Sequence, residues 1–479
     1  MCFQHRPTSL TSGATQGICH ATTPALSSLQ SATRPCPVRS TTPHYFGIPV
    51  HQFLWKTLIF AGLAWLLAFH CAPEAAASTT NSTASFNVEA ATRAYLDQLT
   101  PTQKTRSDSY FEGGYWIQLW SYLWGACVAL LLLQTRLSAR MRDLGVRLVR
   151  FKPLQTAIYA ILYILVTSAL TFPLAVYTDF IREHQYGMAN QGFGGWFWDQ
   201  VKGLILSMVF STLLIVVLMG IIRRMRKTWH IWGAAVTLAF AIIGIVISPV
   251  FIAPLFNKYS LLSDPKVLTP ILRLAHANGI ATDKVYVMDA SRQTTRVSAN
   301  VSGILGTMRI TLNDNLLNRS SLPEIEAVMA HEMGHYVLNH IYKMVLFLGV
   351  VIVIGFAFLR FTTEWFIARC GPRWGISDIG DVAVLPLAML MLSTYFFLLT
   401  PVMNTAIRTQ EIEADMFGLN AARQPDGFAQ AALKLSEYRK MEPTPFEEWF
   451  FYDHPSGATR IRTAMRWKAE NLGTPDAQP

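Results

Sequence analysis

Long hydrophobic runs constrain the fold of this chain more than any other feature of its sequence. A helix of about twenty apolar residues spans the roughly 30 Å hydrocarbon core of a bilayer. Seven runs of that kind occur, at 54–71, 114–134, 155–178, 203–222, 229–250, 343–359 and 381–400. Because 51% of all residues are hydrophobic and they gather in these runs, the sequence predicts a mostly α-helical, multi-pass membrane bundle.

The basic residues predict how these helices are oriented. Lys and Arg gather in the segments 135–154, 223–228 and 360–374, which alternate so that all three lie on one side of the membrane. By the positive-inside rule that side is cytoplasmic. Topology therefore explains the net charge of +10, and nucleic acid is not expected as a partner. The long polar segment 251–342 and everything after residue 401 are expected on the opposite side.

The segment 251–342 is expected to form a small α/β unit. Its apolar pattern predicts one helix and three strands, at about 265–278, 284–288, 296–302 and 307–313. A second helix is predicted from Ser321, because Ser321 and Glu324 have capping-box spacing and apolar residues then recur at helical intervals.

That second helix carries the motif His331-Glu-Met-Gly-His335, an HExxH pattern. Residues four apart share a helix face, so both imidazoles can bind one zinc ion, and Glu332 lies beside them as a catalytic base. The alternative is a helix with two polar-face histidines and no metal. Six scattered cysteines without paired spacing argue against thiolate ligands and a disulfide framework.

A catalytic zinc site needs a third protein ligand. His340 is close in sequence, but five residues after His335 correspond to about 140° around a continuous helix, so it is interpreted as a helix-end or interface histidine. A later helix offers Glu411 as the third ligand and Asp415, four residues on, to orient a histidine through its ring N–H. Glu413 points elsewhere. The alternative is a solvated acidic helix face.

At these motifs the sequence resembles the type I CaaX prenyl proteases, which are gluzincin-type membrane metallopeptidases, and a bacterial relative is expected. The resemblance covers about residues 170–465. It rests on five patterns in order: IAPLFNK at 252–258, RIxLxDxLL at 309–317, HExGHxxxxH at 331–340, RxxExxAD at 408–415 and HPxxxxR at 454–460.

The resemblance implies a set of catalytic side chains around one Zn2+ ion per chain. The metal ligands would be His331, His335 and Glu411. The catalytic residues would be Glu332, Asp415, His454 and Arg460, with Asp415 as an orienting group or proton donor and the last two near the developing oxyanion. Ser298 and Ile407 stand where the family has Asn and Ser, so substrate registration is expected to differ.

The chain is therefore expected to have five regions: an N-terminus that does not fold, a signal peptide or first transmembrane helix ending near three alanines, a membrane domain, a zinc metallopeptidase domain with transmembrane helices near 343–359 and 381–400, and a tail. Their bounds are 1–53, 54–77, 78–250, 251–470 and 471–479.

The function expected is that of a membrane-embedded zinc metalloendopeptidase acting on peptide or protein substrates, which could add a strand along residues 296–303. The zinc site is expected to face the periplasm from a bacterial inner membrane, or alternatively the cytosol, as in homologues of the endoplasmic reticulum. Two other readings remain open: a protease for membrane-protein quality control rather than CaaX processing, and a non-catalytic transporter or scaffold. The sequence carries no signal for oligomeric state.

Overall fold

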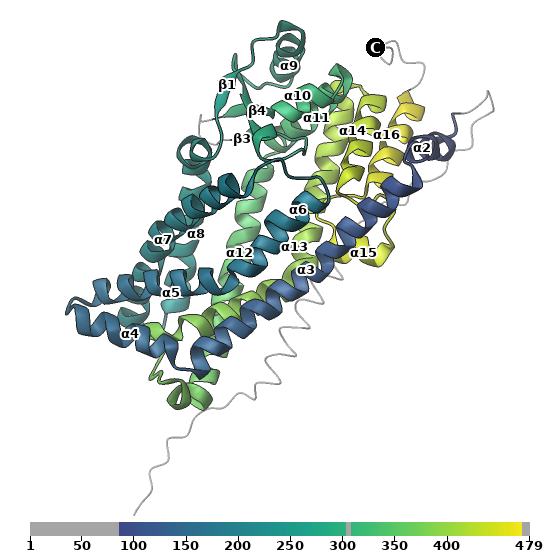
Figure 1. Cartoon of the computed structure of the whole chain (residues 1–479). Coiled ribbons are helices and arrows are strands. Elements are labelled where there is room, and N and C mark those ends of the chain that lie inside the picture. Colours follow the sequence, from purple (N-terminus) through teal and green to yellow (C-terminus); the bar gives the residue numbers. More distant parts are fainter. Residues whose placement is uncertain (1–85, 303–307, 472–479) are drawn as a thin grey trace, which may run out of the picture. The chain divides into compact units, whose positions relative to one another are not determined.

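Six long apolar helical spans dominate the computed structural model, which describes residues 86–302 and 308–471 (Figure 1). The spans are Pro101–Gln134 (α3), Lys152–Gln185 (α5, Lys152–Ala175, to α6, Arg182–Gln185), Phe193–Arg224 (α7), Trp229–Leu255 (α8, Trp229–Ile247, with two further turns), His340–Trp374 (α12) and Val382–Ala422 (mostly α13, Leu385–Ala422). They confirm the predicted helical bundle at six of the seven runs. The remaining run, 54–71, and its proposed cleavage lie outside the described residues.

The spans expose large apolar side chains that a soluble protein would bury. Leu346, Leu398 and Trp116 are all more than 60% exposed. A water-facing surface of that kind would be unfavourable, whereas a hydrocarbon environment covers it without cost. The chain is therefore a multi-pass integral membrane protein.

The three basic segments meet at one end of these helices, as their alternation predicted. Arg136 donates hydrogen bonds to the carbonyls of Pro372 and Arg373, and Arg223 donates to the carbonyl of Gly380. The expected loop 135–154 contains a helix, α4 (Leu137–Leu148), which packs on α5 through small residues such as Gly145. The segment 360–374 is likewise helical, because α12 continues to Trp374.

A four-stranded sheet forms at the other end of the spans; three of its strands lie at the predicted positions, and the strand at 259–261 was not predicted. Its strands are β1 (Tyr259–Leu261), β2 (Val285–Met288), β3 (Ala299–Ser302) and β4 (Arg309–Asn313). The order is β1-β2-β4-β3, with β2 and β4 parallel and the outer pairs antiparallel, so β3 is an edge strand. Helices α9 (Pro265–Ala277) and α11 (Leu322–Val337) bury their apolar side chains against the sheet in one core, which includes Ile310, Leu312 and Met329.

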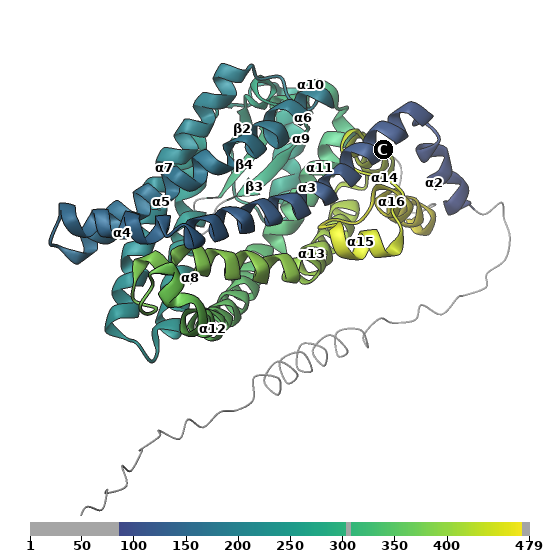
Figure 2. The same cartoon turned by 60° about the horizontal axis from the view of Figure 1, so that its bottom comes forward.

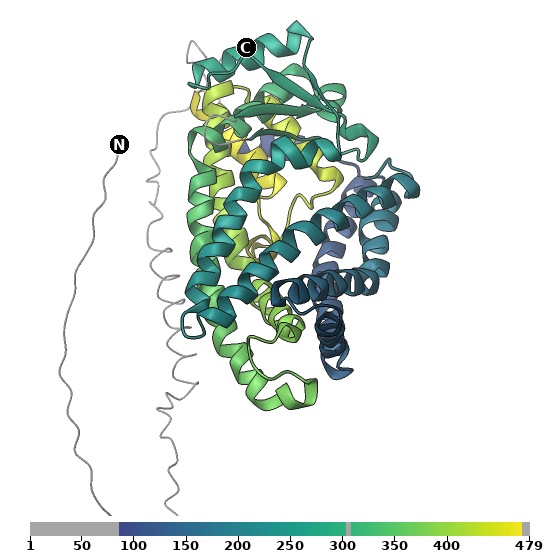
Figure 3. The same cartoon turned by 90° about the vertical axis from the view of Figure 1, so that its left-hand side faces the viewer.

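The C-terminal helices lie at the same end as the sheet (Figures 1 and 3). They are α14 (Pro425–Lys434), α15 (Pro445–Phe451) and α16 (Gly457–Asn471), and the short α10 (Asp314–Arg319) follows β4. Although α2 (Val88–Leu96) comes early in the sequence, it packs beside α14 and α16 (Figure 2), with Leu96, Phe428 and Ile461 in a shared core. Of these helices, α14 packs against α11, and α16 contacts α13.

Candidate active site

The HExxH motif lies on a helix whose start is fixed by its own sequence. The backbone N–H and the hydroxyl of Ser321 donate to the carboxylate of Glu324, which is the predicted capping box. Lys434 of α14 pairs with the same carboxylate at 2.8 Å, so the buried charge is neutralised. The helix then turns His331 and His335, one turn apart, toward α13.

Two glycines let α11 and α13 approach closely. A Cβ atom on Gly418 of α13 would lie 3.0 Å from the backbone nitrogen of His331, and one on Gly334 of α11 would lie 3.2 Å from Cα of Ala414. Any larger residue would force the helices apart. This close packing brings Glu411 of α13 opposite the two histidines.

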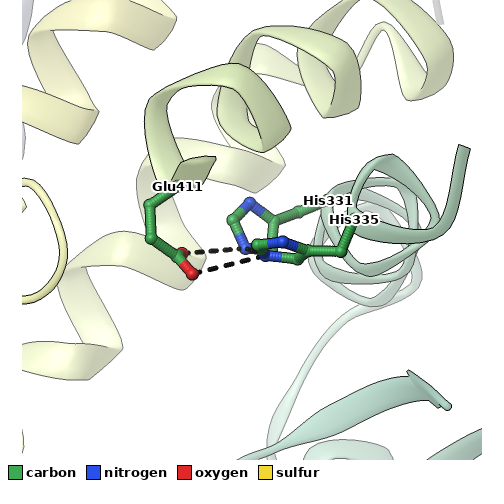
Figure 4. Close-up of side chains that lie close together, drawn as sticks. All are labelled: His331, His335 and Glu411. Carbon is green, nitrogen blue, oxygen red and sulfur yellow. Dashed lines mark hydrogen bonds and ion pairs between the residues drawn. The ribbon is translucent and has the colours of Figure 1, made fainter. Parts of the chain in front are cut away.

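The imidazoles of His331 and His335 and the carboxylate of Glu411 converge on one point (Figure 4). The Nε2 atoms of the two imidazoles are 3.2 Å apart. Nε2 of His331 lies 3.3 Å from Oε2 of Glu411, and Nε2 of His335 lies 3.4 Å from Oε1. A tetrahedral ion with bonds of about 2.05 Å would hold its ligand atoms about 3.3 Å apart. Oε2 of Glu411 is buried and accepts no hydrogen bond among the described residues, which suits an oxygen that binds a cation.

The second ring nitrogen of His331 is held by Asp415. Nδ1 lies 2.8 Å from Oδ1 of Asp415, and Arg460 of α16 donates to both oxygens of that carboxylate, from Nη2 at 2.5 Å and Nε at 2.9 Å. All three side chains are buried. Burial by itself would lower the pKa of His331, but its contacts with the carboxylates of Asp415 and Glu411 raise that pKa to about 9.

The second ring nitrogen of His335 contacts His340, which was not foreseen. Their Nδ1 atoms are 2.8 Å apart, and Nε2 of His340 lies 3.0 Å from Glu413, which also pairs with Lys343. His340 begins α12, as expected of a helix-end residue, but the angle of 140° does not apply. The helix is interrupted at Asn339, whose φ of 59° is left-handed, and this break turns His340 back toward His335.

His454 reaches the same group from the loop before α16. Its Nε2 lies 3.2 Å from Oε2 of Glu411, and its Nδ1 lies 2.8 Å from Asp453. Burial would raise the pKa of Asp453, but the hydrogen bond and charge of His454 lower it overall, helped by Arg439. The carboxylate is therefore ionised and fixes the imidazole at the site. Arg460 lies behind His331, 3.4 Å from its Nδ1.

Glu332 and His331 face a cavity of about 180 Å³. The other walls of this cavity include His454, Arg460 and residues 297–299. Burial raises the pKa of Glu332, although the charges of His331 and His335 oppose that rise. A carboxylate with a raised pKa, beside a group that fits a metal ion, is typical of a general base in hydrolysis.

A larger cavity of about 550 Å³ lies on the other side of His335 and Glu411. Residues 300–302 of the edge strand line it, so β3 runs from one cavity to the other past His331, His335 and Glu411, the candidate metal-binding group. The two positions that depart from the family pattern both face these spaces: Ser298 lines the smaller cavity and Ile407 the larger.

Arg309 was also missed as a candidate, although it opens the RIxLxDxLL pattern. Its guanidinium lies 3.9 and 4.2 Å from the ring centres of Tyr259 and Tyr286 on the wall of the larger cavity. Nε and Nη2 are buried and have no hydrogen-bond partner among the described residues. The available signal was an arginine at the start of a strand whose other residues are all buried.

Comparison with known proteins gives two consecutive family matches. A family model described as CAAX prenyl protease N-terminal, five membrane helices, matches residues 87–258, and one described as peptidase family M48 matches residues 262–468.

Among curated proteins, the metalloprotease YhfN of Bacillus subtilis, itself named as uncharacterized, is 30% identical over 66% of this chain and 75% of its own length. CAAX prenyl protease 1 of Saccharomyces cerevisiae is 28% identical over 67% of this chain and 75% of its own length. The crystal structure of Ste24p from S. mikatae has a similar fold, with a TM-score of 0.67 and 22% identity over 87% of this chain and 96% of that one.

Proposed function

Because this chain belongs to peptidase family M48 and is a membrane metalloprotease, we propose that it is a zinc endopeptidase with His331, His335 and Glu411 as metal ligands and Glu332 as catalytic base. The observation that carries this proposal is the convergence of three ligand atoms within 4.8 Å of one another. Two imidazoles and one carboxylate form a donor set that catalytic zinc favours.

Zinc, when bound, would polarise the scissile carbonyl and make a water molecule acidic near neutral pH. The chain's own residues then move the protons. Glu332 accepts a proton from the attacking water and returns it to the nitrogen of the leaving peptide. Its burial favours that cycle, because a carboxylate with a raised pKa is a stronger base than an exposed one.

Asp415 and Arg460 are proposed to act on His331 rather than on the substrate. Asp415 accepts the Nδ1–H of His331 and so leaves Nε2 free to bind the metal, while Arg460 balances the buried carboxylate. His454 is the better placed of the two candidate oxyanion groups, because its Nε2 faces the metal-binding group. Removing a donor of that kind typically reduces turnover by about a hundredfold to a thousandfold.

The substrate is proposed to bind as an extended peptide along β3. An edge strand has unpaired backbone groups, and a peptide that pairs with it would pass the metal-binding group with side chains in both cavities. Such pairing recognises backbone, so the enzyme would select extended or unfolded segments.

One experiment tests the zinc assignment directly. The protein purified in detergent should contain one zinc ion per chain and cleave a casein-type substrate. A chelator should abolish cleavage, and added zinc should restore it. A protein that cleaves equally well after its metal has been removed would contradict the proposal.

We infer that the site faces the periplasm from a bacterial inner membrane, because the basic segments lie at the opposite end of the helices from the HExxH motif. A reporter enzyme that is active only after export should therefore be active when fused after residue 420. The same reporter fused after residue 226 should be inactive. The reverse pattern would place the site in the cytosol and make cytosolic proteins the substrates.

His340 is proposed to be a positioning residue for His335. We expect His340→Ala to weaken zinc binding by about tenfold to a hundredfold, because partners that orient a metal-binding histidine have effects of that size. Zinc affinity is measured with a competing chelator, and activity is measured with zinc in excess. Restored activity in excess zinc would show that metal binding was the defect.

The matched control is His276→Ala, which changes an exposed histidine on α9. It should leave zinc affinity unchanged. Equal zinc affinity in His340→Ala and His276→Ala would contradict the positioning role.

A further inference from the structure

One end of the bundle carries almost all of the chain's excess charge. We define the basic end as residues 135–152, 223–227 and 360–381, which contain thirteen Lys and Arg against four Asp and Glu, a net charge of +9. The whole chain has a net charge of +10. The positive-inside rule explains why the basic residues lie on one side, but it does not require them to enclose a space.

At this end the basic side chains do line a cavity, of about 520 Å³. Four of them face it from separate elements: Arg142 of α4, Lys152 of α5, Arg223 of α7 and Arg226 just after it. Two carboxylates also line the cavity, Asp378 and Asp381. The walls therefore hold two more positive than negative side chains.

Contacts with neighbouring residues fix Arg142 and Arg223 in the wall of the cavity and leave Lys152 and part of Arg226 available. Arg142 pairs with Asp381, and Arg226 pairs with Asp378 at 3.1 Å. Arg223 donates to the Gly380 carbonyl and to the Thr156 hydroxyl, both at 3.0 Å. The described residues provide no side-chain partner for Lys152. Both this ammonium group and the outer part of Arg226, whose side chain is 57% exposed, remain available to an anion.

Exposed apolar side chains lie close in sequence to the residues that line this cavity. Val146 lines it, and Leu148, Phe151 and Leu154 follow on α4 and the start of α5, with Phe151 68% exposed. Because this is where the membrane helices end, the cavity lies at the boundary between hydrocarbon and water. Helix α4 has its buried small residues on α5 and exposes both arginines and leucines, as interfacial helices do.

We propose that this cavity binds the headgroup of an anionic phospholipid, with the acyl chains lying over Phe151 and Leu154. The phosphate accepts hydrogen bonds from Lys152 and Arg226, while Arg223 adds positive charge at the back of the cavity. Basic pockets between membrane helices suit such headgroups, and exposed apolar side chains at their mouth suit lipid chains better than a soluble anion.

The test is a lipid titration of the full chain in neutral phosphatidylcholine nanodiscs, with bound phosphatidylglycerol counted by native mass spectrometry. The double variant Lys152→Gln, Arg226→Gln should bind phosphatidylglycerol about tenfold more weakly than the wild type. The control Arg140→Gln, Arg147→Gln removes the same charge from α4, where neither residue lines the cavity, and should bind within about twofold of the wild type.

Equal loss in both double variants would overturn the proposal, because it would show diffuse attraction to a charged surface. Unchanged binding in the cavity variant would overturn it as well. If inorganic phosphate competed at concentrations equal to those of the lipid, the ligand would be a soluble anion, and the proposal of a phospholipid would be overturned. Thermal unfolding in neutral lipid should be the same for all three proteins, so that a folding defect is detected. Peptide cleavage is not a readout, so the result is independent of the zinc assignment.

Discussion

Replacing Glu332 with glutamine is expected to reduce peptide hydrolysis by about a thousandfold or more while the zinc content stays at one ion per chain. The amide has nearly the shape of the carboxylate but cannot accept the proton from the attacking water. Glu332 is not part of the metal-binding group, so metal binding should survive. Turnover of a casein-type substrate and zinc content are measured on the same purified protein.

Glu326→Gln is the matched control for this variant. It makes the same change on the same helix, at a side chain that accepts a hydrogen bond from Gln424 away from the histidines. It should retain full activity. If Glu332→Gln bound one zinc ion and cleaved peptide as fast as this control, another group would have to be the base.

Replacing Glu411 with glutamine is expected to remove both the metal and the activity. Glu411 is the proposed ligand from α13, and its loss leaves two histidines from a single helix, which bind zinc much more weakly. Zinc content after dialysis should fall from one ion per chain to nearly none. Because the defect is in metal binding, a large excess of zinc during the assay should restore part of the activity.

Glu413→Gln is the control on the same helix, two residues away. Glu413 contacts His340 and Lys343 instead of the metal-binding group, so this variant should keep its zinc after dialysis. Full zinc retention by Glu411→Gln would show that the carboxylate of α13 is not a ligand, and the assigned site would have to be abandoned.

The sequence predicted the large elements because their signals are local. Apolar runs gave six of the membrane helices, and the Ser321–Glu324 pair gave the start of α11 one residue from its observed position. The approach of Glu411 to His331 was predicted because a catalytic zinc site needs a third ligand, and the resemblance of motifs supported that choice. Its physical cause, the helix packing at Gly334 and Gly418, involves residues more than eighty positions apart and has no local signature.

The contact between His335 and His340 was missed for a related reason. The sequence was interpreted as one helix through the HExxH motif, whereas α11 ends at Val337 and α12 starts at His340. Asn339 is a residue type that tolerates the left-handed conformation, but asparagine occurs in many other settings. Helix α4 was overlooked because four of its twelve residues are charged, and only its packing on α5 shows which side is buried.

Helix α13 is continuous from Leu385 to Ala422, so it joins the apolar run that ends near residue 400 to Glu411, the proposed metal ligand. At 1.5 Å per residue this places the reactive centre about 16 Å along the helix from the end of that run. A continuous helix of that length would set the distance between the proposed reactive centre and the lipid. A polypeptide anchored in the same bilayer would be cut at a set distance from its anchor, whatever its side chains.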